Sequence, residues 1–269
     1  MDTKNIAKKI KSISQEEDPL TAIFYGKAGT GKTTLLGTFP KVLHLDIREE
    51  GQKVLKKVKG IKSARIEEWD DLVSMYWYLK KEKHGFETVG IDTAGQAQML
   101  AVEEVMRKHK KKGKAGDWGT MTQKMWGEVS TMCKELFLDY RDLKKIGINV
   151  VFIAHDRVFK ARDEDEDDDD SNVSRIAPHM GPALSPSIVS TLNAAVDLVG
   201  ETFIGEELIV TKDKKTGKKT KKKVTEYYLR IGPNSSYITK VRRPKSEDKL
   251  PDAVRDPDYD KLLDLMEGD

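Results

Sequence analysis

The residues with the clearest chemical signature form a glycine-rich loop near the start of the chain, GKAGTGKTT at positions 26–34. Gly26, Gly31, Lys32 and Thr33 match the G-x-x-x-x-G-K-S/T pattern of a phosphate-binding loop, or P-loop. Glycines allow such a loop to turn its backbone N–H groups inward at the N-terminus of a helix, where they bind phosphate oxygens. In this pattern the lysine reaches the β- and γ-phosphates, and the threonine hydroxyl holds Mg²⁺.

The flanking sequence supports this interpretation. Residues 21–25 (TAIFY) are typical of a strand, and residues 33–39 are typical of the first turns of a helix. A glycine-rich turn that contains a lysine by chance is the alternative, and it leaves the agreement of motif, strand and helix unexplained. We therefore predict that the loop binds ATP together with Mg²⁺. The residues expected to contact the nucleotide are Gly26, Lys27, Ala28, Gly29, Thr30, Gly31, Lys32, Thr33 and Thr34.

Acidic side chains follow two further strand-like runs. Residues 41–46 (KVLHLD) read as a strand, and Glu49 and Glu50 come soon after it. A carboxylate in that place can orient the water that attacks the γ-phosphate, whereas the alternative is a helix N-terminus enriched in acids. Residues 86–92 (FETVGID) form the second run, which ends in Asp92. This is the Walker B pattern, in which the aspartate serves the Mg²⁺ site.

A histidine stands at the tip of another predicted strand. Residues 149–154 (NVVFIA) precede His155, which can hydrogen-bond the γ-phosphate and report hydrolysis to the loop that follows. A histidine with purely structural hydrogen bonds is the alternative. The expected catalytic centre thus combines Lys32, Asp92, His155 and a glutamate, either Glu49 or Glu50.

The elements that must position these residues alternate as in an α/β protein. Apolar periodicity and turn signals predict helices at 67–83, 97–106, 121–143, 187–194 and 257–266, strands at 195–203 and 237–243, and a β-hairpin at 207–231. We expect a helical segment at 1–19, an ATPase domain at 20–246 and a C-terminal tail with a short helix at 247–269.

Composition sets outer bounds. The chain has 269 residues, 38% hydrophobic and 35% charged, which suits one large α/β domain with appendages or two small domains. The single cysteine, Cys133, excludes an internal disulfide and favours a reducing compartment. No apolar run approaches the ~20 residues of a membrane span, and the polar start lacks the apolar core of a signal peptide. We therefore expect a cytoplasmic protein that has no membrane partner.

Charge is distributed very unevenly, although the formal net charge is only +3. One basic run spans Lys108–Lys114, and eight lysines lie within Lys212–Lys223 at the tip of the hairpin. Each run is either a site for phosphates or a solvated loop. Eight consecutive acids at Asp163–Asp170 repel one another, so we expect a disordered loop at about 160–178.

Taken in order, these features are similar to the RecA-like ATPase core: strand, P-loop and helix, an acid after the second strand, Asp92, His155 and a late Lys240-x-Arg242. Within that class the chain resembles the compact phage ATPases of the single-strand annealing (Sak) group. The shared segments are an opening like IFYGKAGTGKTTL, an Asp-Trp-Gly turn before a long helix, an Ala-His strand tip and a tail like LPDAVRDPDYDKLLDLM. The resemblance covers most of residues 20–266.

The resemblance implies ATP-dependent binding and pairing of single-stranded DNA during phage recombination. It also implies a homo-oligomer, a ring or a filament with ATP at the subunit interfaces, in which Lys240 and Arg242 reach the ATP of a neighbour. A single-stranded-DNA-binding protein is a further candidate partner. The chain departs from the family pattern in two places. Ile47 and Arg48 shift the family's glutamate to Glu49 or Glu50, and acids that would repel DNA occupy the family's DNA-contacting loop.

We therefore predict a single RecA-like α/β domain, a mostly parallel sheet flanked by helices with a late basic β-hairpin. The predicted function is that of a Mg²⁺-dependent ATPase that binds single-stranded DNA and promotes its annealing. An ATP-gated loading or adaptor protein with slow hydrolysis is the alternative. A small-molecule phosphotransferase is a third reading, which is disfavoured because the sequence has no arginine-rich lid.

Overall fold

The computed structural model describes residues 19–56, 58–111, 121–159, 179–212, 219–244 and 249–267, with the backbone alone for residues 110–111, 207–212 and 219–222. The described chain forms a nine-stranded sheet in the order β11-β9-β8-β1-β5-β4-β2-β3, with β10 paired to β8. A separate two-stranded sheet joins β6 to β7.

The strands of the large sheet are β1 (Thr21–Tyr25), β2 (Val42–Asp46), β3 (Lys62–Arg65), β4 (Thr88–Asp92), β5 (Asn149–Ala154), β8 (Leu198–Lys212), β9 (Lys219–Arg230), β10 (Lys240–Val241) and β11 (Ala253–Arg255). The small sheet contains β6 (Asp156–Phe159) and β7 (His179–Pro182). The helices are α2 (Lys32–Leu36), α3 (Gln52–Leu55), α4 (Trp69–Lys81), α5 (Ala94–Lys111), α6 (Gln123–Arg141), the 3₁₀ turn η1 (Asp142–Ile146), α7 (Pro186–Ala195) and α8 (Tyr259–Glu267).

The middle of the large sheet is parallel. Strands β8, β1, β5, β4, β2 and β3 all run in the same direction. Strands β9 and β10 are antiparallel to β8, and β11 is antiparallel to β9. Parallel neighbours need crossover connections, which the helices supply, so the carboxyl ends of six strands share one edge. The predicted fold class, a mostly parallel sheet flanked by helices with a late hairpin, is confirmed.

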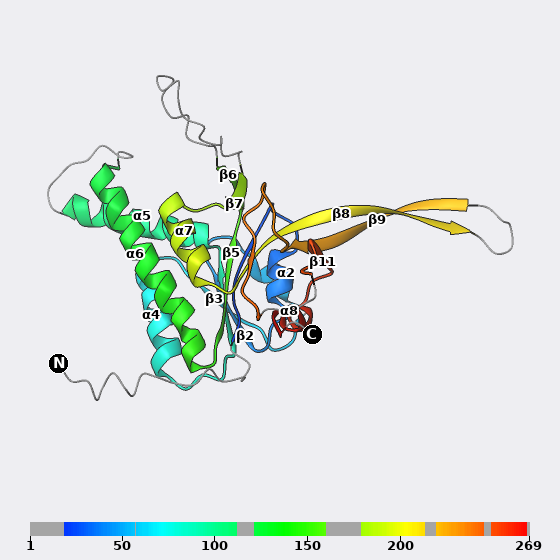
Figure 1. Ribbon diagram of the computed structural model, residues 1–269. Coiled ribbons are helices and arrows are strands. Elements are labelled where there is room, and N and C mark those ends of the chain that lie inside the picture. Colours follow the sequence, from blue (N-terminus) through cyan, green and yellow to red (C-terminus); the bar gives the residue numbers. More distant parts are fainter. Residues whose placement is uncertain are drawn as a thin grey trace, which may run out of the picture.

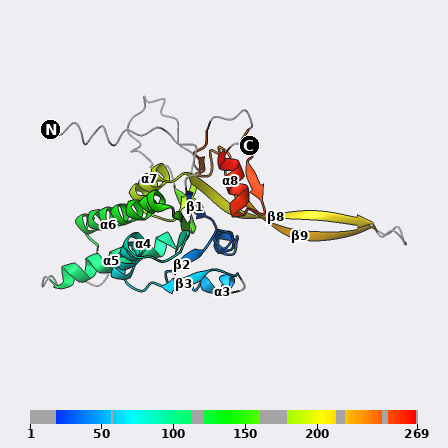
Figure 2. The same cartoon turned by 90° about the horizontal axis from the view of Figure 1, so that it is seen from below.

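Helices cover both faces of this sheet (Figures 1 and 2). Helices α4, α5, α6 and α7 pack on one face, and α2 and α8 pack on the other. Strand β1 alternates between the two cores. Ile23 and Tyr25 lie on the side of α4–α7, whereas Ala22 and Phe24 lie on the side of α2 and α8. A strand buried on both faces explains why this segment is apolar at nearly every position.

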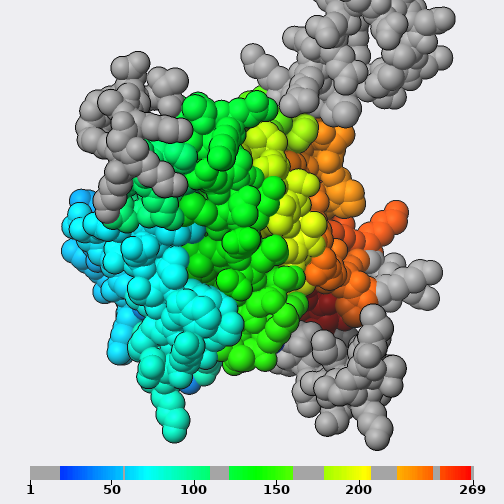
Figure 3. Space-filling model, turned by 90° about the vertical axis from the view of Figure 1, so that its left-hand side faces the viewer, coloured from blue at the N-terminus to red at the C-terminus, as the bar shows by residue number. Residues whose placement is uncertain are grey.

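The layer formed by α4–α7 makes up much of the face seen in Figure 3, where α4 is cyan, α5 and α6 are green, α7 is yellow and later residues appear in orange and red on the right. In α4 the buried side chains are Trp69, Leu72, Tyr76 and Leu79. They recur at helical spacing, so the aromatic stripe of this helix belongs to the core. Cys133 in α6 is fully buried, and burial raises the pKa of its thiol to about 12.

Strands β8 and β9 form a long two-stranded arm that extends away from the rest of the molecule (Figures 1 and 2). The sequence predicted a strand at 195–203 and a separate hairpin strand from 207, but β8 is continuous over Leu198–Lys212. Gly205 and Glu206 do not interrupt it, because each has a cross-strand partner in β9. The predicted strand at 237–243 is reduced to the two residues of β10.

Several expectations concern residues outside the described ranges. These are the helical segment within residues 1–18, the acidic tract Asp163–Asp170, most of the basic run Lys108–Lys114 and the arm tip at 213–218. Among the helices that the structure describes, none is long and apolar enough to cross a membrane.

Candidate functional site

The P-loop connects the carboxyl end of β1 to α2 and is fixed to the neighbouring strand β8. Gly26 has φ 150°, and a Cβ at this position would lie 2.3 Å from the carbonyl oxygen of Thr202. The Thr202 hydroxyl donates to the carbonyl oxygen of Tyr25 at 3.2 Å and lies 2.6 Å from the hydroxyl of Thr30. Only glycine fits the first position of the loop, because β8 approaches the backbone so closely.

Lys32 is the first residue of α2, and its side chain turns back over the loop. Its Nζ donates hydrogen bonds to the carbonyl oxygens of Gly26 at 2.8 Å and Lys27 at 2.7 Å. The residue is only 7% exposed, and burial lowers its pKa although Asp92, Asp156 and Glu49 act in the opposite direction. A buried cation therefore lies inside the loop that the motif assigns to phosphate.

Thr33 and Asp92 meet although their strands are not neighbours. Asp92 ends β4, which is separated from β1 by β5. The Thr33 hydroxyl donates to Asp92 Oδ2 at 2.8 Å, and Asp92 is 3% exposed. Hydroxyl and carboxylate oxygens suit Mg²⁺, which takes few protein ligands and completes its shell with phosphate oxygens and waters. The described residues contain no group of three or more His, Cys, Asp or Glu side chains that could hold a metal ion.

A histidine that the sequence analysis did not select lies behind Asp92. His44 in β2 is fully buried, with Nε2 3.1 Å from Asp92 Oδ2 and Nδ1 3.0 Å from the hydroxyl oxygen of Ser63. Because a carboxylate only accepts hydrogen bonds, Nε2 donates to Asp92, and in the neutral ring Nδ1 then accepts from the Ser63 hydroxyl. Gly51 leaves room for this arrangement, since a Cβ there would lie 2.9 Å from Asp92 Oδ2. The sequence feature that could have identified His44 is a histidine inside an otherwise apolar strand.

Glu49 and His155 come together on the same edge of the sheet. Glu49 Oε1 lies 3.4 Å from His155 Nε2, and these residues follow β2 and β5. The same oxygen lies 3.4 Å from Gln96 Nε2 and 3.5 Å from the Thr93 hydroxyl. Gln96 and Thr93 were not selected from the sequence, where they stand in the connection from Asp92 into α5. The Glu49 carboxylate thus has three polar neighbours from two other segments.

Glu50 lies elsewhere. Its carboxylate forms an exposed ion pair with Lys53, one turn further along the chain. Arg48, which directly precedes these two glutamates, joins their loop to α5, because its guanidinium donates to both carboxylate oxygens of Glu103 at 2.6 and 2.8 Å. Of the two candidate glutamates, the structure brings only Glu49 close to His155.

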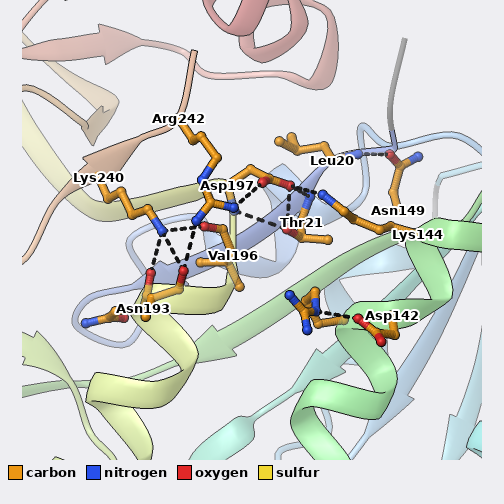
Figure 4. A network of polar contacts seen from close by, with 12 residues as sticks. Leu20, Thr21, Asp142, Lys144, Asn149, Asn193, Val196, Asp197, Lys240 and Arg242 are labelled. Carbon is orange, nitrogen blue, oxygen red and sulfur yellow. Dashed lines mark hydrogen bonds and ion pairs between the residues drawn. The ribbon is translucent and has the colours of Figure 1, made fainter. Parts of the chain in front are cut away.

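Lys240 and Arg242 are held at the opposite end of the sheet (Figure 4). Lys240 Nζ donates to the carbonyl oxygens of Asn193 and Val196, each 2.7 Å away, at the C-terminus of α7. Arg242 Nη1 donates to Asp197 Oδ1 at 3.1 Å. Asp197 precedes β8 and is therefore at the amino end of the parallel strands, whereas the P-loop follows their carboxyl ends. The structure does not bring these two cations to the P-loop of their own chain.

A P-loop after one strand, a hydroxyl–carboxylate pair at the tip of another and a glutamate beside a strand-tip histidine together define the class: a P-loop nucleotide-binding domain. Comparison with protein families agrees with this class. The chain belongs to the AAA domain family AAA_24, which matches residues 18–243. The P-loop ATPase class predicted from the sequence is therefore confirmed.

Comparisons with individual proteins do not narrow this class further. No curated protein matches the chain. A solved structure of a DnaB-like replicative helicase, described with its interactions with primase, is similar at 10% sequence identity and a TM-score of 0.36. The alignment covers 83% of this chain and 57% of the helicase chain. The narrower resemblance to the single-strand annealing group stays a prediction.

Proposed function

We propose that this protein is a Mg²⁺-dependent ATPase that binds single-stranded DNA, and that its nucleotide state controls DNA binding. The meeting of Thr33 and Asp92 beside Lys32 carries the ATPase part, with 2.8 Å between the Thr33 hydroxyl oxygen and Asp92 Oδ2. This pair supports Mg²⁺ bound together with a triphosphate. Glu49, whose carboxylate lies 3.4 Å from His155 Nε2 at the same edge of the sheet, supports hydrolysis rather than binding alone.

Each residue has a distinct role in this proposal. The P-loop N–H groups and Lys32 hold the β- and γ-phosphates, and Thr33 and Asp92 hold Mg²⁺ directly or through its waters. When bound, the ion neutralises charge on the phosphates. Glu49 orients the attacking water and takes its proton as the water oxygen bonds to the γ-phosphorus; the bond from that phosphorus to the β-phosphate oxygen breaks, and ADP leaves. His155 lies 3.4 Å from Glu49 at the start of the β6 segment, so we assign it the task of sensing the γ-phosphate.

The β8–β9 arm supports the DNA-binding part. Its strands pair without a break from Glu201 and Arg230 to Lys212 and Lys219, and Figure 1 shows the arm extending far from the helices. Eight lysines lie within Lys212–Lys223. A basic segment of this kind attracts a phosphate backbone, and each phosphate neutralised on a single strand contributes about −0.7 to the salt slope of binding.

The resemblance found in the sequence extends the proposal to a biological role and an assembly. That role is the annealing of complementary strands in phage recombination. The assembly is a head-to-tail homo-oligomer, a ring or a filament, in which Lys240 and Arg242 act on the ATP of a neighbour. To do so, they would exchange their contacts at the end of α7 for contacts with phosphate. A single-stranded-DNA-binding protein is the candidate partner on DNA.

Measuring phosphate release with and without single-stranded DNA tests the central proposal. Lys32→Ala should abolish hydrolysis, while Asp92→Asn should reduce turnover more than nucleotide binding. Lys80→Ala, on the exposed surface of α4, is the matched control and should match the unmodified protein. A wild-type rate in Lys32→Ala would refute the site assignment. Strong stimulation by DNA supports the proposal, whereas a constant rate favours the loading or adaptor protein.

A charge-matched pair of variants tests the arm. Changing Lys221–Lys223 to glutamine should weaken DNA binding and flatten its salt slope by about 2 if each lysine contacts one phosphate. The control changes three exposed lysines in and after α4, Lys80, Lys81 and Lys83. The two variants carry the same net charge, so general electrostatic attraction changes equally in both. Equal salt slopes in the two variants would contradict DNA binding by the arm.

A further inference from the structure

A cavity of about 490 Å³ adjoins the P-loop on the side of the arm. One wall consists of residues 29–35, in the P-loop and α2. The other walls come from distant parts of the chain: Val54 in α3, Tyr227 in β9, and Asp256 and Pro257 after β11. Figure 1 shows α2, β11 and the root of the arm close together. The mechanism proposed above uses none of these distant residues.

Tyr227 stands directly beside the loop. A Cβ added at Gly31 would lie 3.2 Å from Cδ1 of the Tyr227 ring, and Gly31 itself has φ 92°. The tyrosine is nevertheless 43% exposed, so much of this aromatic side chain remains accessible where the cavity opens. A large exposed aromatic residue next to a phosphate site offers a stacking surface.

Hydrogen bonds hold the far wall in place. The backbone N–H of Asp256 donates to the carbonyl oxygen of Tyr227 at 2.7 Å, and β11 pairs with β9. The N–H of Tyr259 donates to the hydroxyl of Thr38, just after α2, at 2.9 Å. Arg255 also forms an ion pair with Glu226. The C-terminal segment thus joins the end of α2 to the root of the arm around the cavity.

We propose that this cavity binds the nucleoside half of the nucleotide, with the base stacked on Tyr227 and with Val54 and Pro257 as apolar sides. The proposal rests on the proposed function, because the nucleoside reaches the cavity only when the P-loop holds the phosphates. Phosphates bound in the loop leave the rest of the ligand to adjoining space, and this cavity begins at the loop. Its volume lies within the ~300–1,000 Å³ of small-molecule sites. An aromatic face stacks on every base, so Tyr227 contributes affinity without selecting the base.

Comparing Mg²⁺·ATP with Mg²⁺·tripolyphosphate separates the two halves of the site. Calorimetric titration of the full chain should show that Tyr227→Ala weakens ATP binding about tenfold, as loss of a base–aromatic stack does, and leaves tripolyphosphate affinity unchanged. Tyr227→Phe keeps the ring and should bind ATP as the unmodified protein does. The matched control is Ile204→Ala. Ile204 faces Tyr227 across the arm, is also 43% exposed and does not line the cavity.

Other outcomes would overturn the proposal in recognisable ways. An equal loss of ATP and tripolyphosphate affinity in Tyr227→Ala would mean that the ring only supports the P-loop through Gly31. Unchanged ATP affinity would remove Tyr227 from the site, while the ATPase proposal would stand as long as Lys32→Ala still abolishes binding. If Lys32→Ala binds ATP normally, the proposed function fails and this inference fails with it.

A fluorescence measurement provides an independent check that does not depend on a destabilising truncation. In Tyr227→Trp, ATP should change the indole emission relative to the same titration of the unmodified protein, because the base stacks on the new ring. Tripolyphosphate should leave that difference unchanged. Identical responses to the two ligands would contradict a nucleoside in the cavity.

Discussion

Replacing His44 by leucine tests how Asp92 is held. The substitution replaces the buried imidazole with an apolar side chain and so removes both ring nitrogens. Asp92 Oδ2 would keep the Thr33 hydroxyl at 2.8 Å but lose the Nε2 donor at 3.1 Å. Asp92 is 3% exposed, so water does not readily replace the missing donor, whereas the exposed Ser63 can turn to solvent.

The expected size of the effect follows from this geometry. A hydrogen bond to a charged group contributes about 1.5–3 kcal/mol, so we expect the free energy of unfolding to fall by about 2 kcal/mol. Groups that orient metal ligands from behind typically change metal affinity or activity by about 10–100-fold. The Mg²⁺ concentration that gives half-maximal hydrolysis should therefore rise at least about tenfold in His44→Leu. The rate at saturating Mg²⁺ should change less, because Lys32 and Glu49 are untouched.

Urea unfolding and Mg²⁺ titration of phosphate release measure these two effects. His44→Gln restores a donor toward Asp92 and should recover most of the Mg²⁺ response. Ser63→Ala removes a part-buried hydrogen bond and leaves Nδ1 of the buried His44 without that partner, so it should cost about 1 kcal/mol but leave the Nε2 donor on Asp92 in place. If His44→Leu loses stability but its Mg²⁺ titration overlays that of the unmodified protein, His44 is a core residue and does not position Asp92.

Three further changes have clear expected outcomes. Glu49→Gln should retain ATP binding and stop hydrolysis, whereas Glu50→Gln should hydrolyse ATP normally. Phosphate release measures hydrolysis, and retention of ATP on a filter measures binding. The opposite pattern would assign the general base to Glu50. Burial alone would raise the pKa of Asp197, but hydrogen bonds from a threonine and a lysine hold it below its usual range. Its stabilising effect is therefore present at neutral pH and is lost as pH falls below about 4. Urea unfolding should find Asp197→Asn about 2 kcal/mol less stable at pH 7 and closer to the unmodified protein at pH 3.5, whereas a constant difference would contradict this. Gly90→Ala should lower the free energy of unfolding by about 1–3 kcal/mol in the same assay, because the new Cβ would lie 2.3 Å from Cδ2 of Leu36 in α2. Unchanged stability would mean that α2 can shift away from β4 without cost.

The sequence predicts those parts of the site whose residues lie close together in the chain. The P-loop residues are adjacent in the chain, and their order alone predicts a strand, a turn and a helix. Asp92 was recognisable because a run buried on both faces ends in a carboxylate. The core face of α4 follows from the helical spacing of Trp69, Leu72, Tyr76 and Leu79.

The contacts that the sequence did not predict are those between distant segments. His44 reads as an anomaly in an apolar strand until β2 is placed beside β4. Tyr227 reads as one of several aromatic residues of a hairpin until β9 is placed beside the P-loop. Edge strand β3 is polar, with the sequence KSAR, and only its pairing with β2 identifies it as a strand. The order and register of strand pairing determine which residues become neighbours of His44, Tyr227 and β3. The local periodicity of the sequence predicts neither order nor register.

The position of Lys240 and Arg242 also limits the stoichiometry of any assembly. Their side chains bind groups at the amino ends of the strands, and five-residue β1 separates that level from the P-loop by ~16 Å at ~3.3 Å per residue. One copy therefore cannot direct both its P-loop and these two cations at the same nucleotide. If the cations serve a nucleotide, every complete site belongs to two copies. An open filament then has one incomplete site at one end, whereas a closed ring has none. The hydrolysis rate per subunit would rise with filament length but would be fixed in a ring.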